Sequence, residues 1–487
     1  MTVQFAFDNS YARLPERFFA QLAPTPVAEP KLIRVNSALA EQLGIDPAFL
    51  ASADGIAVLS GNRVPEGAAS VALAYAGHQF GHFNPQLGDG RAILLGEVVG
   101  KDGLRRDIQL KGAGPTPFSR RGDGRAALGP VLREYLVSEA MAALGLPTTR
   151  ALAAVTTGED VVRETMLPGG VLTRVASSHI RVGTFQYFAA RGDNEAVTLL
   201  ADHAIARHYP EAAREAKPYL AFLRMVAERQ ASLIARWLSI GFIHGVMNTD
   251  NCSVAGETID YGPCAFMDEY HPGTVFSSID QNARYAYGNQ PSIGLWNVSR
   301  LAETLLPLID PDQDKALEAA KEVLGVFGPR FHGEYAALLR RKIGLAQTQA
   351  DDDELAQDLL KRMMANNADF TLTFRRLGEG DGAAARDLFL DVTAFDAWHG
   401  RWLARLASED ASPEARRTAM RAINPAFIPR NHRVEAALNA AIERDDFGPF
   451  EELLAVLSRP YDDQPGMERD AEPPAESERV RQTFCGT

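Results

Sequence analysis

HGVMNTDN, residues 244–251, follows a long helical pattern and ends nine residues before Asp260-Tyr261-Gly262. Asn251 closes this loop, and Asp260 stands two residues before a glycine, which permits a sharp turn. Mg²⁺ prefers oxygen ligands, usually one or two from the protein and the rest from phosphate and water. The two residues therefore predict a metal site, although both are also ordinary turn residues between short strands.

A glycine-rich turn and a hairpin lie upstream of this loop. The turn is Gly88-Asp89-Gly90-Arg91, and its glycines would let backbone N–H groups approach a phosphate closely. Such turns are equally common as plain hairpin turns. Residues 91–100 and 106–114 have the patterns of two strands joined by a short turn, so we predict a hairpin directly after the glycines.

Lys111 ends the second strand of this hairpin, and residues 129–147 then have a helical pattern that includes Glu134. A glutamate in that position can hold the lysine as an ion pair, as in protein kinases. The order of turn, lysine, glutamate and metal pair also matches a kinase. A kinase, however, needs an Asp shortly after the His of its catalytic loop, and Val246 stands there. Three interpretations remain open. The chain is an inactive kinase, its match to the kinase order is a coincidence, or it is an enzyme that uses ATP in a different reaction.

The composition narrows the class of protein. The 487 residues include 46% hydrophobic and 23% charged side chains, which is typical of a globular protein. The net charge of −13 argues against general binding to nucleic-acid backbones. Three cysteines form no disulfide framework or zinc spacing, and the sequence has neither a signal-peptide pattern nor a run of 18 apolar residues. We expect a cytoplasmic protein that binds neither membranes nor nucleic acid.

Strand patterns dominate the first part of the chain and helical patterns the second. Further strands are predicted at 150–158, 170–178 and 180–188, a long amphipathic helix at 220–241, and a second hairpin at 252–262. This order predicts an α+β, bilobal, kinase-like fold with a ligand cleft between the lobes. The expected parts are an N-terminal extension (1–75), a kinase-like N-lobe with the nucleotide-binding elements (76–185), a C-lobe with the catalytic loop and metal site (186–345), a helical C-terminal region (346–460) and a flexible tail (461–487).

Two arginines lie on or beside the predicted strands. By default we expect Arg174 and Arg181 to lie at the protein surface. An arginine on a strand that faces the cleft would instead be placed for bidentate binding of phosphate.

Three long blocks of sequence are more specific than any single motif. The strings YAGHQFGHFNPQLGDGRA, QLKGAGPTPFSRRGDGRAALG and HGVMNTDNCSVAGETIDYGP resemble the selenoprotein O family, whose bacterial members are also called protein nucleotidyltransferase YdiU. The resemblance covers nearly the whole chain. It implies a protein-kinase-like pseudokinase fold that binds ATP in a flipped orientation. It also implies transfer of AMP to hydroxyls of protein Ser, Thr or Tyr, and of UMP from UTP in bacterial members.

The resemblance implies a role for each matching residue. Asp250 corresponds to the proposed proton acceptor, and Asn251 and Asp260 to the ligands of Mg²⁺ or Mn²⁺. Lys111 and Glu134 correspond to an ion pair that grips phosphate. Nucleotide contacts are further implied for Gly88, Gly90, Arg91, Asp123, Gly124, Arg174, Arg181 and Asp260.

Two other functions compete with this one. A small-molecule phosphotransferase of the aminoglycoside-kinase type has Asp directly after His-Gly, where this chain has Val246. A non-catalytic ATP-binding scaffold has less need of a metal pair.

Some eukaryotic family members carry selenocysteine third from the C-terminus, where Cys485 stands here. A regulatory disulfide from Cys485 to Cys252 or Cys264 is therefore a further hypothesis, and we expect a monomer.

Overall fold

The first part of the chain forms an antiparallel sheet. The computed structural model describes residues 5–484. Eight strands pair in the order β1-β3-β6-β7-β10-β9-β2, with β8 against β10, and each of these pairings is antiparallel. The strands are β1 (Phe19–Gln21), β2 (Lys31–Val35), β3 (Val71–Leu73), β6 (Ala92–Val99), β7 (Arg105–Lys111), β8 (Ala126–Ala127), β9 (Arg150–Val162) and β10 (Met166–Ala176).

The predicted hairpin is confirmed as β6 and β7. Its register pairs Ala92 with Lys111, so the glycine-rich turn before β6 lies beside the lysine that ends β7. On the other side of β7, Arg174 of β10 is paired with Gln109. Because alternate residues of a strand share a face, Gln109 and Lys111 face the same side, together with Arg174. The sheet thus gathers three long polar side chains on one face.

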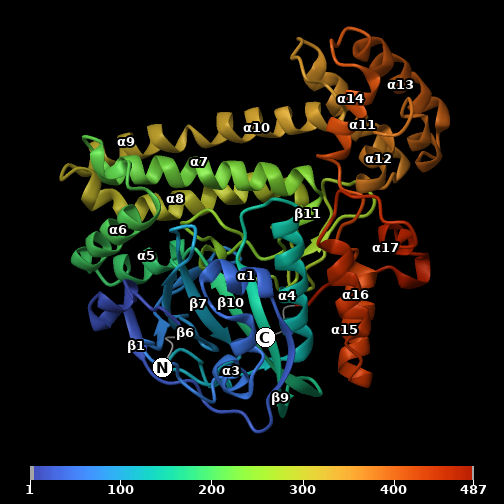
Figure 1. The fold of residues 1–487 in the computed structure, drawn as a ribbon. Helices are drawn as coiled ribbons and strands as arrows, with labels where there is room; N and C mark the ends of the chain where they lie inside the picture. The colour runs from blue at the N-terminus through green and yellow to red at the C-terminus, as the bar shows by residue number, and fades with distance from the viewer. Residues whose placement is uncertain (1–4, 485–487) are drawn as a thin grey trace.

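Helix α4 (Leu128–Ala143) confirms the predicted helix and packs against β9 and β10. Pro130 lies in its first turn, and Gly145, two residues beyond its last residue, has a φ of +79°. A left-handed glycine is the usual way to end a helix, because it lacks the Cβ that would clash there. On its other side α4 contacts α15 (Asn431–Arg444) and α16 (Gly448–Leu457), as Figure 1 shows.

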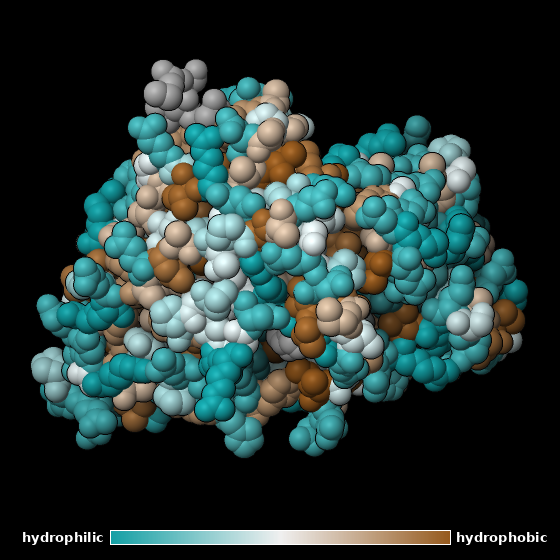
Figure 2. Space-filling view, turned by 90° about the horizontal axis from the view of Figure 1, so that it is seen from below, coloured by the Kyte–Doolittle hydropathy of each residue, from teal (hydrophilic) through white to brown (hydrophobic). Residues whose placement is uncertain are grey.

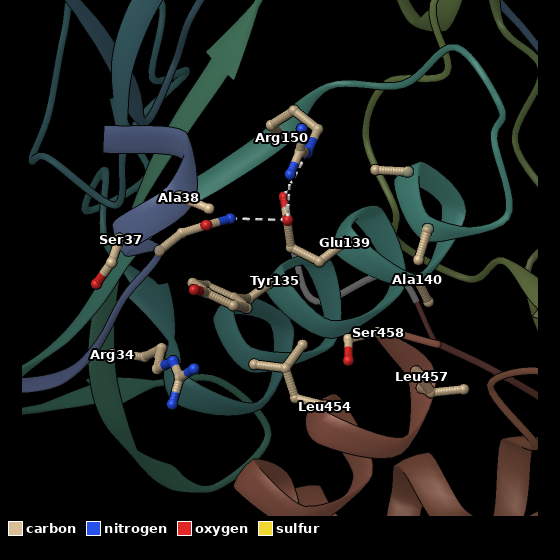
Figure 3. A pocket seen from close by; sticks show the side chains of 13 residues that line it. Arg34, Ser37, Ala38, Tyr135, Glu139, Ala140, Arg150, Leu454, Leu457 and Ser458 are labelled. Carbon is tan, nitrogen blue, oxygen red and sulfur yellow. Dashed lines mark hydrogen bonds and ion pairs between the residues drawn. The ribbon is translucent and has the colours of Figure 1, made fainter. Parts of the chain in front are cut away.

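Glu139 anchors α4 to the strand that follows it. Its carboxylate accepts hydrogen bonds from Arg150 at 2.6 and 2.8 Å, from Asn36 Nδ2 at 2.8 Å and from the backbone N–H of Ala151 at 2.9 Å. Figure 3 shows Glu139 and Arg150 at the edge of a hollow between α4, the N-terminal segment and α16. The charges of this hollow are satisfied within the chain, since Arg34 pairs with Glu451.

Replacing Glu139 with Ala is expected to lower the free energy of unfolding by about 2 kcal/mol, because Arg150 and Asn36 lose a charged acceptor. Urea denaturation of the variant measures this loss. Glu41→Ala, at an exposed position of α1 (Ser37–Leu43), is the control and should leave the midpoint unchanged. Equal midpoints for the two variants would contradict the anchoring role.

The strand predicted at 180–188 is wrong, because this stretch forms helix α5 (Val182–Ala189). Its valine, phenylalanines and tyrosine favour a strand by propensity. The buried positions Val182, Phe185 and Phe188 are nevertheless spaced three apart, which is a helical period. Burial of that face against the helical part of the molecule therefore overrides the local preference.

The second predicted hairpin, at 252–262, is also absent. Ser253 and Thr258 form isolated bridges, to Arg181 and Thr148 respectively, and the short strand β11 (Phe242–Ile243) pairs instead with β12 (Ala265–Phe266). Gly256 with a φ of +76° and Asp260 with a φ of +64° interrupt an extended conformation. The segment therefore bonds to neighbouring elements rather than to itself.

After α5 the chain forms a layer of long helices, which lies on one side of the sheet domain (Figure 1). The predicted helix at 220–241 is confirmed as α7, which lies between α8 and α10 in Figure 1. Contacts of α7 with α8, α9 and α10 bury its apolar side. The helices of this layer are α6 (Asn194–His208), α7 (Pro218–Ser239), α8 (Gln290–Ile309), α9 (Gln313–Leu324) and α10 (Phe327–Lys342).

A cluster of further helices stands at the end of α10, and the chain then returns to α4 (Figure 1). Arg430, which precedes α15, is fully buried and pairs with Asp369 at 2.7 Å and Asp268 at 2.8 Å. This buried triad joins the returning segment to the helical layer. The remaining helices are α2 (Pro47–Leu50), α3 (Ala53–Leu59), α11 (Asp352–Asn366), α12 (Phe370–Leu377), α13 (Val392–Leu406), α14 (Pro413–Arg421) and α17 (Glu468–Ala471).

The last described residues are docked, which differs from the flexible tail that the sequence predicts. Thr483 is 2% exposed, and its N–H and Oγ1–H donate to the carbonyls of Phe276 and Pro263. Arg479 pairs with Glu269 at 2.7 Å. The Pro-rich and acidic composition suggested a disordered or loosely docked tail, but these hydrogen bonds and the ion pair hold its described part against the segments around Pro263 and Phe276.

Cys485 and the hypothesis of its disulfide lie outside the described residues. The other two thiols are free and buried. Burial raises the pKa of Cys252 to about 12 and that of Cys264 to about 11. In these surroundings both stay protonated at neutral pH and are weak nucleophiles.

One hydrophobic core runs through most of the chain. It includes residues from Tyr11 to Leu457 and so crosses the boundaries between the first four of the five expected parts, whose division stays a prediction. On the face seen in Figure 2, hydrophobic residues are scattered among hydrophilic ones rather than gathered in one patch. None of the helices in the described part of the chain is long and apolar enough to cross a membrane.

Candidate active site

A cavity of about 710 Å³ lies between the sheet, α4 and the loop segment around 246–263. It brings together most of the residues that the sequence singled out: Gly90, Arg91, Lys111, Glu134, Arg174, Arg181, Asp250, Asn251 and Asp260. Gly88, Asp123 and Gly124 do not line it. Groups that are far apart in the sequence therefore face one space.

Lys111 is held by two carboxylates. Its ammonium donates to Glu134 and to Asp260 Oδ1, the latter at 3.2 Å. The predicted contact of Lys111 with Glu134 is thus present, and Glu134 is 2% exposed. A buried carboxylate fixes the ammonium at the cavity wall, so the cation needs little reorganisation to meet an incoming anion.

Arg174 is buried beside this pair rather than at the surface. Its guanidinium donates to Gln109 Oε1 at 2.6 Å, to Glu134 at 3.1 Å and to Asp260 at 2.5 Å. The default surface interpretation of this arginine is wrong, since only 2% of it is exposed. A strand of the sheet holds it, and three acceptors fix its plane.

Asp260 is the shared partner of these cations. Its φ of +64° is unusual for a residue other than glycine and turns the chain sharply at the cavity. Burial raises the pKa of its carboxyl, but Arg174, Lys111 and Arg181 outweigh burial and hold that pKa well below its usual range. Asp260 is therefore ionised at neutral pH, the form in which a carboxylate can bind a metal ion.

Arg181 is also buried, with 1% exposed, and lies 3.7 Å from Asp89 and 3.6 Å from Asp260. Its guanidinium stacks 4.5 Å from the ring centre of Tyr75. The sequence interpretation missed Asp89 and Tyr75 as partners. An aspartate inside a glycine-rich turn is ordinary in sequence, and only the fold buries it beside an arginine.

Asp250 differs from Asp260 in its surroundings. It is 8% exposed, its Oδ2 accepts from Gln79 Nε2 at 3.1 Å, and its Oδ1 is buried without a hydrogen-bond partner. Burial raises the pKa of its carboxyl to about 6. A carboxylate with a raised pKa and an unused oxygen is suited to accept a proton near neutral pH.

Asn251 lines the same cavity next to Asp250. Its Nδ2 donates to the carbonyl of Val246 at 3.0 Å, which leaves the amide oxygen as its other polar atom. Val246, at the position of the missing kinase Asp, therefore orients the Asn251 side chain through its backbone carbonyl.

A family model described as Protein adenylyltransferase SelO matches residues 1–458. The chain belongs to this family. Proteins named "Protein nucleotidyltransferase YdiU" are similar over the full length of both chains, with 66% identity in Rhodopseudomonas palustris (strain BisB5) and in Methylorubrum extorquens, and 64% in Bradyrhizobium sp. (strain ORS 278). As a SelO family member, the chain is an enzyme of the nucleotidyltransferase class.

The glycines of the turn have a packing role in this SelO family member. A Cβ at Gly88, whose φ is +76°, would lie 2.3 Å from the Phe118 ring, and one at Gly90 would lie 2.9 Å from the carbonyl oxygen of Phe118. The absence of a side chain at both glycines therefore lets the loop that contains Phe118 pack closely against the turn. Their nucleotide contacts stay a prediction.

Asp123 and Gly124 lie in the loop after the lysine strand, outside the cavity lining. Asp123 pairs with Arg163 at 2.8 Å and accepts from the N–H of Arg125 at 2.9 Å. Gly124 has a φ of +66°, and its carbonyl accepts from the N–H of Gly114, whose backbone leaves no room for a side chain. Any contact of this pair with a nucleotide stays a prediction.

Gly124→Ala is expected to lower the free energy of unfolding by clearly more than Gly145→Ala. Both positions have a left-handed φ, which costs Ala about 1–2 kcal/mol. A Cβ at Gly124 would also lie 2.1 Å from the backbone of Gly114, whereas one at Gly145 meets nothing within 4 Å. Thermal denaturation of both variants compares them, and equal losses would show that the loop yields freely.

Proposed function

We propose that this chain transfers AMP from ATP to Ser, Thr or Tyr hydroxyls of proteins and releases pyrophosphate. Membership of a protein adenylyltransferase family supports the reaction class. The observation that carries the proposal is a single cavity that combines a cation cluster, two oxygen ligands and a buried carboxyl with a pKa of about 6. The Lys111–Glu134 contact between strand and helix also supports a protein-kinase-like bilobal fold.

Asn251 and Asp260 are suited to hold Mg²⁺ or Mn²⁺. An amide oxygen and a permanent carboxylate line the same cavity, and phosphate oxygens and water complete such a site. No group of three or more His, Cys, Asp or Glu side chains gathers as a metal site within residues 5–484, and a two-ligand site needs none. When bound, the ion would neutralise charge on the phosphates and polarise the reacting phosphorus.

Lys111, Arg174 and Arg181 would bind the phosphates. They now neutralise Asp260 and Glu134, so their positions are set before a nucleotide enters. AMP transfer requires that the β- and γ-phosphates leave together. The flipped orientation implied by the resemblance would direct that end of ATP toward these buried cations and leave the α-phosphorus open to the acceptor.

Asp250 would act as the base. Its carboxylate, which lines the cavity, accepts the proton of the acceptor hydroxyl while the hydroxyl oxygen bonds to the α-phosphorus. The bond from the α-phosphorus to its bridging oxygen breaks, and pyrophosphate leaves with that electron pair. Such a base contributes typically about 10²–10⁴-fold to the rate.

Labelled nucleotides test the reaction. The protein is incubated with Mg²⁺ or Mn²⁺, a bacterial lysate and ATP labelled at either the α- or the γ-phosphate, with α-labelled UTP in a parallel reaction. Label on protein from the α position alone is expected. Label from the γ position alone would identify a kinase, and no label on any protein would favour a nucleotide-binding scaffold. The ratio of ATP to UTP incorporation measures the nucleotide preference.

Asp250→Asn keeps the shape of the side chain but lowers its basicity, so kcat should fall about 10²–10⁴-fold while the Kd for ATP stays within about threefold. Asp260→Ala should abolish transfer and weaken metal-dependent ATP binding, because a ligand and the partner of three cations are lost. Initial rates with α-labelled ATP and calorimetric titration measure the two effects. Wild-type turnover by Asp250→Asn would rule out the base.

A further inference from the structure

A second hollow adjoins the candidate active site. It has a volume of about 550 Å³ and shares Phe80 and Ile279 with the larger cavity. We call it the side groove, and its other lining residues are Asp280, Gln281, Asn282, Arg284, Asn289, Ser292 and Ile293. Side chains that could bind a peptide, mostly neutral and polar, thus continue directly from the catalytic cavity.

The turn of the β4–β5 hairpin (Gly77–Gln79 and His82–Asn84) stands between the two spaces. Gln79 donates to Asp250, and the N–H of Phe80 donates to Asn248 Oδ1 and to Tyr285 OH, each at 3.1 Å. The turn is therefore tied both to the candidate base and to Tyr285, the residue that follows Arg284 of the side groove. A polypeptide whose hydroxyl reaches Asp250 has the side groove as an adjoining path.

Arg284 gives the side groove a positive charge. Arg284 forms no ion pair with a carboxylate in the described part of the chain, and its buried Nε has no hydrogen-bond partner. The guanidinium is stacked 4.8 Å from the ring centre of Trp296 and 5.7 Å from that of Tyr285. Two rings thus hold the cation in place without neutralising it.

The one acidic residue among the described lining residues does not cancel this charge by contact. Asp280 is 6% exposed, and its two carboxylate oxygens accept from the backbone N–H groups of Arg284 at 2.9 Å and Tyr285 at 2.8 Å. Its carboxylate therefore orders the loop that carries Arg284. The guanidinium remains available to an outside anion.

We infer that the side groove binds the acceptor polypeptide and that Arg284 recognises an Asp or Glu side chain close to the acceptor hydroxyl. A guanidinium matches the two oxygens of a carboxylate, and stacking on Trp296 pre-orients it, so little entropy is lost on binding. Arg284 is then a specificity-determining residue that never touches the nucleotide. The inference rests on the proposed transfer to protein hydroxyls.

The test maps modified sites. Wild type, Arg284→Gln and Arg284→Glu are each incubated with a bacterial lysate and α-labelled ATP, and the modified hydroxyls are located by mass spectrometry. Wild-type sites should be enriched in Asp and Glu at a flanking position, relative to unmodified hydroxyls of the same proteins. Arg284→Gln should lose this enrichment, and Arg284→Glu should shift it toward Lys and Arg. Removing the acid from one acceptor protein should lower wild-type kcat/KM about tenfold.

Arg300→Gln is the matched control. Arg300 also stacks over Trp296, at 5.1 Å, but it pairs with Glu303 at 2.7 Å and does not line the side groove. This variant should keep the wild-type preference, and the KM for ATP should be unchanged in all variants. Modified sites without acid enrichment, or enrichment that survives Arg284→Gln, would overturn this inference alone. No α-label on any protein would overturn the proposed function as well.

Discussion

The carboxylate of Asp260 is the interaction on which the arrangement depends. It pairs with Lys111 at the end of β7, with Arg174 on β10 and with Arg181 at the start of α5. A buried ionic group is tolerated only when its partners are complete, and loss of one partner leaves an uncompensated charge. The loop after α7 is therefore held against the sheet in one position, and the cavity between them keeps a defined shape.

The same network gives two aspartates in one cavity different pKa values. Three cations keep Asp260 ionised, whereas burial without a close cation raises the pKa of Asp250 to about 6. Identical side chains thus acquire different properties from their surroundings: Asp260 is held as an anion, and the carboxyl of Asp250 has a raised pKa. Because the fold holds these cations and Asp250 in place, the proposed reaction would need little reorganisation of the cavity.

Local patterns predicted the elements whose sequence signal agrees with their packing. The β6–β7 hairpin, α4 and α7 formed where alternation or helical period indicated them. Residues 180–188 and 252–262 did not follow their local preference, because contacts with distant segments decided their conformation. Asp89 and Gln109 were missed as partners of arginines for the same reason: their residue types are ordinary in a turn and a strand.

The sequence by itself determined the family, the β6–β7 hairpin with helices α4 and α7, and the residue types available for ATP chemistry, since these are encoded in contiguous segments. The distance between Lys111 and Glu134, the burial of Arg174 and Arg181, and the unpaired Oδ1 of Asp250 were decided only by the tertiary structure. Charge and pKa in a cavity depend on which groups meet there and on how much water is excluded, and neither is a property of a local segment.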